Sequence, residues 1–277
     1  MEICPKLPVS GFVLGCSMIK AIFFDIDGTL VSFKTHAMPA SARDALLRLR
    51  KKGVKLFIAT GRNMDSIRFM MDEGLFDGAI GMNGQLCKMG EECVFANPVS
   101  RQDLQAAVEM AKSGEHTIGF LMECSGFVNR ADARVVGACA YANMLVPPER
   151  DPEAAFDEPV YQIHYYGERG SENALIERTQ GLLATRWSPL FADVYPVGGG
   201  KDVGIRAICE YLGIAQAETM AFGDGENDVS MLRYAHIGVA MGNASDAVKA
   251  QADFVAGDVD EGGLAGAVEH FERMGLL

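Results

Sequence analysis

The sequence predicts an α/β fold in which a second α/β or α+β unit is inserted into a doubly wound, parallel sheet. Short apolar runs recur along the chain, and segments with helical periodicity separate them. Strands that are buried on both faces give such continuous runs, whereas half-exposed strands alternate apolar and polar residues. A change of this pattern after residue 84 predicts the insertion.

The elements of the first unit alternate in type along the chain. Before the insertion we expect strands at 21–24, 55–59 and 79–82 and helices at 40–52 and 64–73. After it we expect strands at 219–222, 237–240 and 253–256 and helices at 201–212, 227–234, 244–250 and 263–274. Alternating strands and helices predict a sheet with helices packed on both faces.

The inserted unit is expected to span residues 85–196, so the first unit comprises residues 18–84 and 197–277. Its elements are predicted as helices at 101–112, 133–143 and 172–183 and strands at 117–123, 127–129, 160–166 and 191–195. Glycine-bearing segments at 83–84 and 197–200 are suited to act as hinges. Residues 1–17 are interpreted as an N-terminal extension outside the fold, with Met18 beginning the protein.

Composition excludes several classes of partner. A formal net charge of −12 argues against nucleic acids, because such binding requires clustered lysines and arginines. No apolar run approaches the roughly 18 residues that span a bilayer, so no membrane partner is expected. The seven cysteines are widely spaced and contain no C-x-x-C pair, which is typical of reduced thiols. We expect a cytoplasmic protein, either a monomer or a weak homodimer.

Polar residues follow several of the predicted strands. Asp25 and Asp27 follow the first strand, Thr60-Gly61-Arg62 follows the second, and the segment 223–228 follows the strand that begins at Thr219. Ligands of parallel sheets bind outside the carboxyl ends of the strands. Lys201 begins a helix directly after three glycines. The sequence therefore predicts that these side chains share one site.

These residue types suit phosphoryl transfer. One of two closely spaced carboxylates can attack phosphorus while the other handles the proton of the leaving oxygen. Crowded carboxylates require a hard cation, and Mg²⁺ fits better than zinc because no His or Cys cluster accompanies them. Lys201 and Thr60 offer donors for phosphoryl oxygens, although alone they could be a solvated lysine and a helix cap. A nucleotide-binding P-loop is excluded because its G-x-x-x-x-G-K-[ST] pattern is absent.

Four motifs resemble those of the haloacid dehalogenase superfamily: D-I-D-G-T-L at 25–30, I-A-T-G-R at 58–62, G-K-D at 200–202 and G-D-G-E-N-D at 223–228. The position of the insertion resembles the Cof-type branch, which implies a Rossmann-like core with a C2 (type IIB) cap. The resemblance implies that Asp25 is the nucleophile, forming an aspartyl-phosphate, and that Asp27 is the general acid and base. It further implies phosphate-binding residues Thr60, Gly61, Lys201 and Asn227, and Mg²⁺ ligands Asp25, Asp27 (through its carbonyl), Asp224 and Asp228.

Other candidates have weaker support. Arg62 could contact the substrate or be an exposed residue at a helix start, and Asn83 could contact phosphate or form a turn. Asn243 is interpreted as a helix cap. Six residues of the insertion could line a substrate pocket, although aromatic residues there are more typical of a core: His164, Tyr165, Tyr166, Arg130, Arg134 and Trp187.

The resemblance implies a phosphatase that acts on a small phosphorylated metabolite. Sugar phosphates are the first expectation, followed by phosphorylated cofactors such as flavin mononucleotide or pyridoxal phosphate. A phosphomutase would use the same aspartyl-phosphate and is an alternative. A non-enzymatic binding protein is disfavoured because the motif carboxylates, Thr60 and Lys201 are all present.

Overall fold

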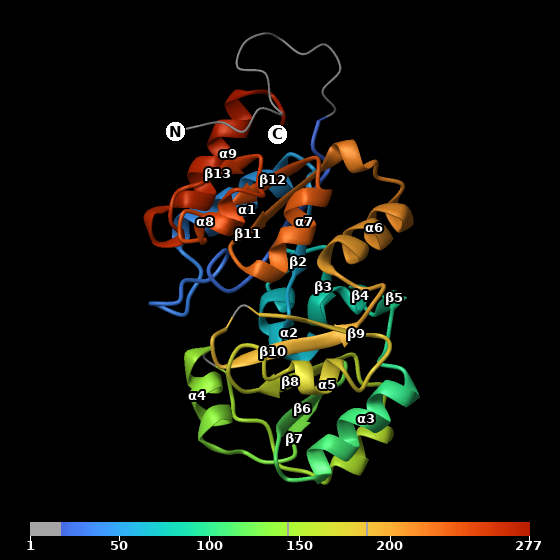
Figure 1. Ribbon diagram of the computed structural model, residues 1–277. Coiled ribbons are helices and arrows are strands. Elements are labelled where there is room, and N and C mark those ends of the chain that lie inside the picture. Colours follow the sequence, from blue (N-terminus) through green and yellow to red (C-terminus); the bar gives the residue numbers. More distant parts are fainter. Residues whose placement is uncertain (1–17, 143, 187) are drawn as a thin grey trace.

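The structure is a computed structural model that describes residues 18–142, 144–186 and 188–277. The expectations for residues 1–17, for position 143 and for Trp187 lie outside the described residues. Two domains, each built on its own sheet, lie one above the other (Figure 1). We call the unit with the larger sheet the core domain and the inserted unit the cap domain.

The core domain contains an eight-stranded sheet with the order β13-β12-β11-β1-β2-β3-β4-β5. Strands β13 to β3 of this order are parallel, and β4 and β5 are antiparallel additions at one edge. The strands are β1 (Ala21–Phe24), β2 (Lys55–Ala59), β3 (Gly78–Gly81), β4 (Leu86–Met89), β5 (Glu92–Ala96), β11 (Thr219–Gly223), β12 (Ile237–Ala240) and β13 (Phe254–Val255). β1 is central and fully buried, as its apolar sequence requires.

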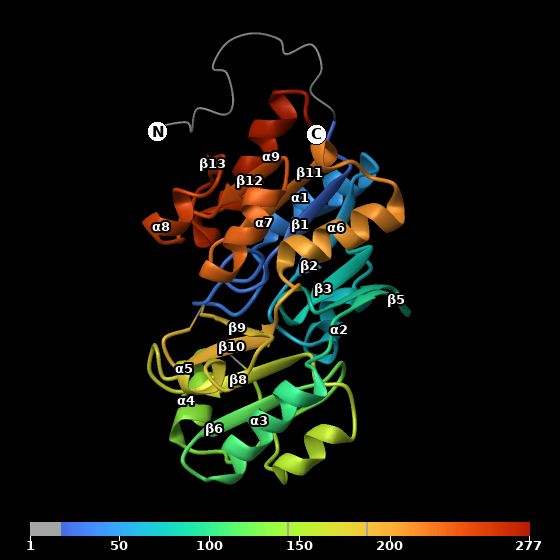
Figure 2. The same cartoon turned by 45° about the vertical axis from the view of Figure 1, so that its right-hand side comes forward.

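Helices cover both faces of the core sheet, which confirms the doubly wound α/β prediction (Figure 2). One apolar cluster joins the sheet to α1 (Ala40–Lys51), α2 (Met64–Asp72) and α9 (Gly263–Arg273). A second cluster, on the opposite face, joins it to α6 (Lys201–Leu212), α7 (Val229–Tyr234) and α8 (Asp246–Lys249). Short 3-10 helices span Met82–Gly84, Pro152–Phe156, Gln216–Glu218, Glu226–Asp228 and Val259–Glu261. None of the helices in the described ranges combines the length and apolar character that crossing a membrane requires.

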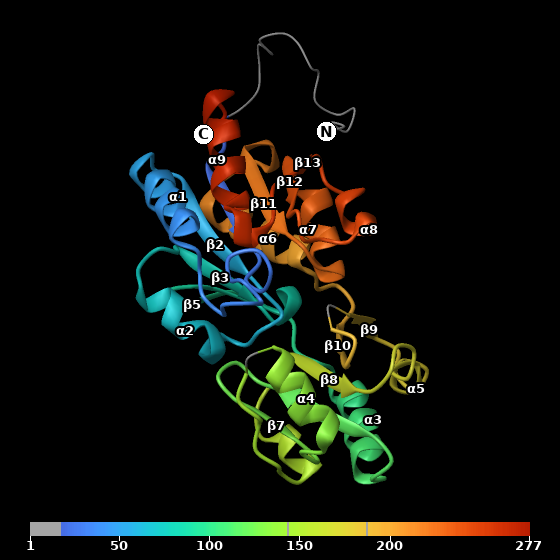
Figure 3. The same cartoon turned by 90° about the vertical axis from the view of Figure 1, so that its left-hand side faces the viewer.

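The cap domain is an antiparallel sheet with the order β7-β6-β8-β10-β9 and three helices. Its elements are α3 (Arg101–Lys112), β6 (Thr117–Leu121), β7 (Gly126–Val128), α4 (Ala133–Tyr141), β8 (Gln162–Tyr166), α5 (Asn173–Ile176), β9 (Leu182–Thr185) and β10 (Phe191–Pro196). α3 packs on one face of the sheet with an apolar cluster beneath it. α4 lies at the other face, near the core domain (Figure 3).

Two boundaries differ from the expectations. Residues 86–96 pair with β3 as β4 and β5 of the core sheet, so the insertion begins at about residue 97 and the expected start at 85 is wrong. The expected helix at 172–183 is also wrong, because helical structure ends at Ile176 and β9 begins at Leu182. The apolar stretch that suggested a continuing helix instead pairs with β10, where tertiary pairing outweighs local periodicity.

The two glycine-bearing segments meet at the junction of the domains. Gly84 has a φ of 88°, and a Cβ atom built there would lie 1.9 Å from the carbonyl oxygen of Gly200. Gly200 precedes Lys201 and has a φ of 143°. Glycine is therefore required at Gly84 both for its backbone conformation and for the close approach of the second segment. This contact fixes where α6 begins relative to β3.

Candidate active site

The ends of three neighbouring strands bring the motif residues together. β1 pairs in parallel with β11 on one side and with β2 on the other. Asp25 follows β1, Asp224 follows β11, and Thr60 follows β2. Since parallel strands end at the same edge of a sheet, residues that are far apart in the chain lie side by side there.

The ammonium group of Lys201 lies between two carboxylates at this edge of the sheet. Its side chain is 1% exposed, and its Nζ donates to Asp25 Oδ1 at 2.6 Å and to Asp228 Oδ1 at 2.5 Å. Asp228 Oδ2 in turn accepts from the backbone N–H groups of Asp224 and Gly225, at 2.9 and 2.8 Å. Asp228 thus orients the lysine and closes the loop that carries Asp224.

Asp224 is held against the loop that follows β1. Its Oδ1 accepts from Thr29 Oγ1 at 2.9 Å, and its Oδ2 accepts from Asn243 Nδ2 at 3.3 Å. Asn243 also donates to the Gly28 carbonyl at 2.8 Å. The expectation that Asn243 caps a helix is wrong, because Ser245 caps α8. Sequence reasoning missed the contacts of Thr29 and Asn243 with Asp224, because Thr29 lies within the first motif without an assigned role and Asn243 lies outside the four motifs.

The site carries more negative than positive charge. Carboxylate oxygens of Asp25, Asp224 and Asp228 lie within 4.8 Å of one another. Burial, with the charges of Asp228 and Asp27, raises the pKa of Asp25 to about 7, although Lys201 acts in the opposite direction. Burial and the charge of Asp25 raise the pKa of Asp224 well above its usual value. A hard divalent cation fits this oxygen-only donor set and would supply the missing positive charge.

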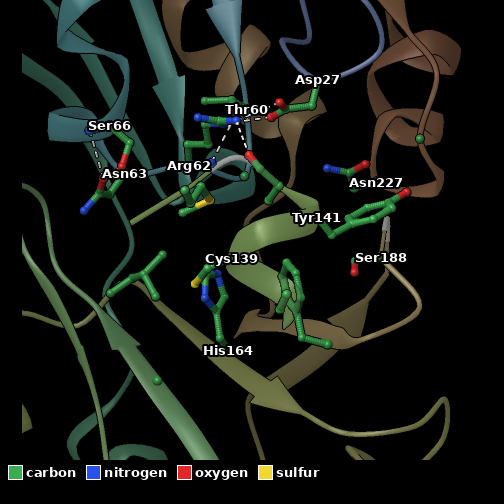
Figure 4. Close-up of a pocket in the computed structure, with 18 of the residues that line it drawn as sticks. Asp27, Thr60, Arg62, Asn63, Ser66, Cys139, Tyr141, His164, Ser188 and Asn227 are labelled. Atoms are coloured by element: carbon green, nitrogen blue, oxygen red, sulfur yellow. Dashed lines mark hydrogen bonds and ion pairs between the residues drawn. The ribbon is translucent and has the colours of Figure 1, made fainter. Parts of the chain in front are cut away.

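The carboxylate of Asp27 lies apart from that cluster and forms an ion pair with Arg62. The guanidinium donates from Nε to Asp27 Oδ2 at 2.8 Å and from an Nη to Asp27 Oδ1 at 2.7 Å (Figure 4). The same Nη donates to the Ala142 carbonyl of the cap domain at 3.1 Å. Arg62 is therefore neither free nor an exposed helix-start residue, and it connects the Asp27 carboxylate to the residue that follows α4.

Thr60 is buried and does not cap α2. Its Oγ1 accepts from the backbone N–H of Arg62 at 3.1 Å, whereas Asn63 caps the helix by accepting from the N–H of Ser66 at 3.1 Å. This turn leaves the Thr60 hydroxyl hydrogen for another acceptor, because the contact uses only an oxygen lone pair. Both Thr60 and Gly61 line the cavity beside Asp25.

Asn83 connects the motif loops to the cap domain through a buried network. Its Nδ2 donates to Gln162 Oε1 at 2.9 Å and to Asp193 Oδ2 at 2.8 Å, and its Oδ1 accepts from Asn227 Nδ2 at 3.0 Å. Gln162 Nε2 also donates to the Gly61 carbonyl at 3.1 Å. The structure thus places Asn83 and Asn227 together, and sequence reasoning missed their partners on the cap sheet.

A cavity of about 730 Å³ extends from Asp25 and Asp27 beneath the cap domain. Among the cap candidates, His164 and Tyr166 line it. Tyr165 does not, because it lies on the other face of the sheet, where its hydroxyl is 2.6 Å from His116 Nδ1. Burial lowers the pKa of His164 to about 4 even though the Asp193 carboxylate lies 3.3 Å away, so this imidazole is neutral.

Together, the fold and the site define a capped protein with a doubly wound α/β core and with a carboxylate cluster and a buried lysine at its strand ends. Residues 22–268 match the model of the haloacid dehalogenase-like hydrolase family. The chain belongs to that family, as its four motifs predicted.

Individual relatives agree with this assignment. The chain is 31% identical to the pyridoxal phosphate phosphatase YbhA of Escherichia coli, over 86% of this chain and 93% of YbhA. Its structure resembles that of the subclass IIB sugar phosphatase BT4131, with 38% identity, a TM-score of 0.84 and coverage of 93% and 100% of the two chains. The phosphatase BT1666 of Bacteroides thetaiotaomicron gives 36% identity, a TM-score of 0.86 and coverage of 98% and 100%. The prediction of a phosphoric monoester hydrolase of this superfamily with a subclass IIB cap is confirmed by these similarities.

Proposed function

We propose that this protein is a Mg²⁺-dependent phosphatase that hydrolyses small phosphorylated metabolites through an aspartyl-phosphate on Asp25. One observation carries the proposal: the buried Lys201 pairs with Asp25 and Asp228, Asp224 lies within 4.8 Å of both carboxylates, and Asp25 and Asp224 line a capped cavity. Such a cluster is costly to assemble unless a cation and an anionic ligand use it.

In the first step, a carboxylate oxygen of Asp25 attacks phosphorus and the bond from phosphorus to the leaving oxygen breaks. Asp27 donates a proton to that oxygen, which departs as an alcohol. Lys201 and the Thr60 hydroxyl bind phosphoryl oxygens, and their charge and hydrogen bonds stabilise the transition state. Asp27 must first exchange its Arg62 partner for the substrate, because both of its oxygens are engaged in the ion pair.

In the second step, Asp27 removes a proton from a water molecule that attacks the same phosphorus. The bond between phosphorus and the Asp25 oxygen breaks, which releases inorganic phosphate and regenerates the carboxylate. The cap domain limits the access of other water while the phosphoenzyme exists.

Mg²⁺ would be held by Asp25 and Asp224, with the Asp27 carbonyl as a further ligand and Asp228 supporting the site. When bound, it neutralises the charge of the phosphoryl group and of the carboxylates around it. The raised pKa values of Asp25 and Asp224 support this proposal, because burial and the neighbouring carboxylates disfavour their charged forms and a bound cation would favour them.

The relatives narrow the proposed substrate to two classes of phosphate monoester. One relative is a pyridoxal phosphate phosphatase and another is a sugar phosphatase. Both a sugar phosphate and a phosphorylated cofactor therefore remain within the proposal. A cytoplasmic location and a monomeric or weakly dimeric state stay predictions.

The test is Mg²⁺-dependent release of phosphate from an aryl phosphate by the Asp25→Asn variant. We expect the turnover to fall at least about 1,000-fold, since an amide oxygen cannot replace the nucleophilic carboxylate. Asp72→Asn is the matched control, because Asp72 is an exposed residue at the end of α2, outside the cavity. Turnover retained by Asp25→Asn would refute the nucleophile. With a sugar phosphate as the probe, phosphate found only on a second hydroxyl of the sugar would indicate a mutase instead.

A further inference from the structure

The cap wall of the cavity is formed by one face of the cap sheet. Along β8 and β10, alternate side chains point to opposite faces. His164 and Tyr166 of β8 and Phe191 of β10 line the cavity, whereas Ile163 and Tyr165 pack beneath α3. The residues on the cavity face are therefore set by the register of this sheet, in which His164 is opposite Asp193 and Tyr166 is opposite Phe191.

These cavity-facing residues form a contiguous aromatic surface, most of which is buried, because Tyr166 and Phe191 also pack against α4. The ring centroids of His164 and Phe191 lie 5.0 Å apart, those of Tyr166 and Phe191 lie 5.8 Å apart, and those of His164 and Tyr166 lie 6.0 Å apart. Tyr141 of α4 faces the same cavity from the other side (Figure 4). Its ring lies 6.0 Å from that of Phe33 in the core domain, at the point where the two domains meet.

The cationic groups of this cavity are already neutralised. Each described arginine that lines it pairs with a carboxylate: Arg62 with Asp27, Arg169 with Glu226 and Arg186 with Glu172. The last pair is buried, and the guanidinium also donates to the carbonyl groups of Gly167 and Glu168. Breaking the buried Arg186–Glu172 pair to neutralise a charged leaving group would be costly. The Arg169–Glu226 pair is exposed to solvent and is therefore weak.

Hydroxyl groups would also find few partners on this wall. The Ser188 hydroxyl accepts from the N–H of Leu190 and keeps its hydrogen for a ligand, whereas the neutral His164 contacts Gln162 and Tyr166 through its two ring nitrogens. A buried hydroxyl that loses water without gaining a partner is unfavourable. A sugar ring would bring several such hydroxyls to a surface that is mainly aromatic and aliphatic.

From these observations we infer that the preferred leaving group is an uncharged alcohol with a planar, aromatic or heteroaromatic ring. This inference rests on the proposed phosphatase function and narrows its substrate class. The phosphoryl group lies at Asp25 and Lys201, and the ring packs against His164, Tyr166 and Phe191, where offset or edge-on ring contacts are favourable. A bisphosphate or a carboxylated substrate is disfavoured because Arg186 is held by Glu172 in a buried pair. Arg62, which substrate binding would release from Asp27, lies at the phosphoryl end of the cavity and not beside the aromatic residues (Figure 4).

The experiment compares three phosphate monoesters of primary alcohols with the full-length protein in Mg²⁺, so that the chemistry of the bond is matched. The probes are benzyl phosphate, 4-carboxybenzyl phosphate and glucose 6-phosphate. We expect kcat/KM for benzyl phosphate to exceed those of the other two by about tenfold or more. Equal or greater kcat/KM for glucose 6-phosphate or for the carboxylated ester would overturn the inference.

Phe191→Leu tests the aromatic surface while keeping an apolar side chain of similar size. It should lower kcat/KM for benzyl phosphate about fivefold, mainly through KM, and lower that for glucose 6-phosphate by a clearly smaller factor. Phe120→Leu is the matched control, because Phe120 is a buried ring of β6 that belongs to the cluster beneath α3. Equal losses on both substrates in Phe191→Leu would indicate a purely structural role and overturn the assignment.

The two proposals fail in different ways. If no monoester releases phosphate in the presence of Mg²⁺, the proposed phosphatase function is refuted, and so is the inference about the leaving group. If phosphate is released and Asp25→Asn abolishes the release, but the order of substrates is reversed, only the inference about the leaving group falls.

Discussion

Replacing Lys201 by methionine should destabilise the protein strongly. The ammonium is buried and donates to Asp25 at 2.6 Å and to Asp228 at 2.5 Å, so its removal leaves two buried carboxylates without their partner. Removing one member of a buried ion pair costs about 3–5 kcal/mol. Methionine has a similar length and is apolar, so the loss would reflect charge rather than a cavity.

The size of this loss should depend on pH. Burial and neighbouring carboxylates raise the pKa of Asp25 to about 7 even though Lys201 lowers it, so the pKa in the variant lies higher still. A proton taken up by Asp25 removes one of the uncompensated charges. The free energy lost through Lys201→Met should therefore be larger at about pH 8 than at about pH 6.

The assay is urea unfolding with a chelator present, followed by the same measurement with Mg²⁺. A cation at about 100 times its Kd adds about 2.7 kcal/mol, so Mg²⁺ should restore much of the stability of Lys201→Met without restoring phosphate release. Lys51→Met is the control, since Lys51 is exposed on α1 and should change stability by no more than about 0.5 kcal/mol. A loss below about 1 kcal/mol for Lys201→Met at about pH 8 would refute the reasoning.

Two further predictions concern the junction of the domains. A Cβ atom at Gly61 would lie 3.0 Å from Asp193 Oδ2 and 3.1 Å from Asn83 Nδ2, so Gly61→Ala should reduce the free energy of unfolding. We expect a reduction of about 1–3 kcal/mol in urea unfolding, and an unchanged midpoint would contradict it. His164 has a pKa of about 4 in the folded protein, whereas an unfolded histidine titrates near about 6.5. As the pH falls, His164 therefore binds a proton in the unfolded chain before it does so in the folded protein. The free energy of unfolding should be highest above about pH 6.5 and should decrease by on the order of 3 kcal/mol between about pH 6.5 and about pH 4. His164→Gln should flatten this dependence, and an unchanged slope would contradict the prediction.

The sequence predicted most of the core domain because its signals are local. The buried run 21–24 and the carboxylates after it suffice to locate the central strand and the edge of the sheet at which the motif residues meet. β4 and β5 were missed because antiparallel strands at a sheet edge are only half-buried and carry no continuous apolar run. The helix expected at 172–183 failed because the pairing of β9 with β10 depends on residues elsewhere in the chain.

The residues missed around the site are those that act through partners distant in sequence. The pairing of Arg62 with Asp27 depends on the turn after β2, and its contact with the Ala142 carbonyl depends on how the cap domain docks. Asp193 lies within an apolar strand and carries no motif, so only the structure reveals its contact with Asn83. Three of the motifs could be predicted because they lie at strand ends, and the fourth because Lys201 begins a helix directly after three glycines. The pairings described here, by contrast, required the folded arrangement.

The network around Asn83 has a consequence for how such proteins can be recombined. Asn83 has a left-handed backbone (φ 52°, ψ 39°), and its amide is divided between Asn227 of the core domain and Gln162 and Asp193 of the cap domain. A chimera that received a foreign cap would leave this buried amide with orphaned hydrogen-bonding groups, unless the graft brought matching acceptors on its middle strands. The hydrogen bonds of Asn83 thus connect the two domains through buried polar groups. A chimera should therefore transfer the cap domain together with residue 83.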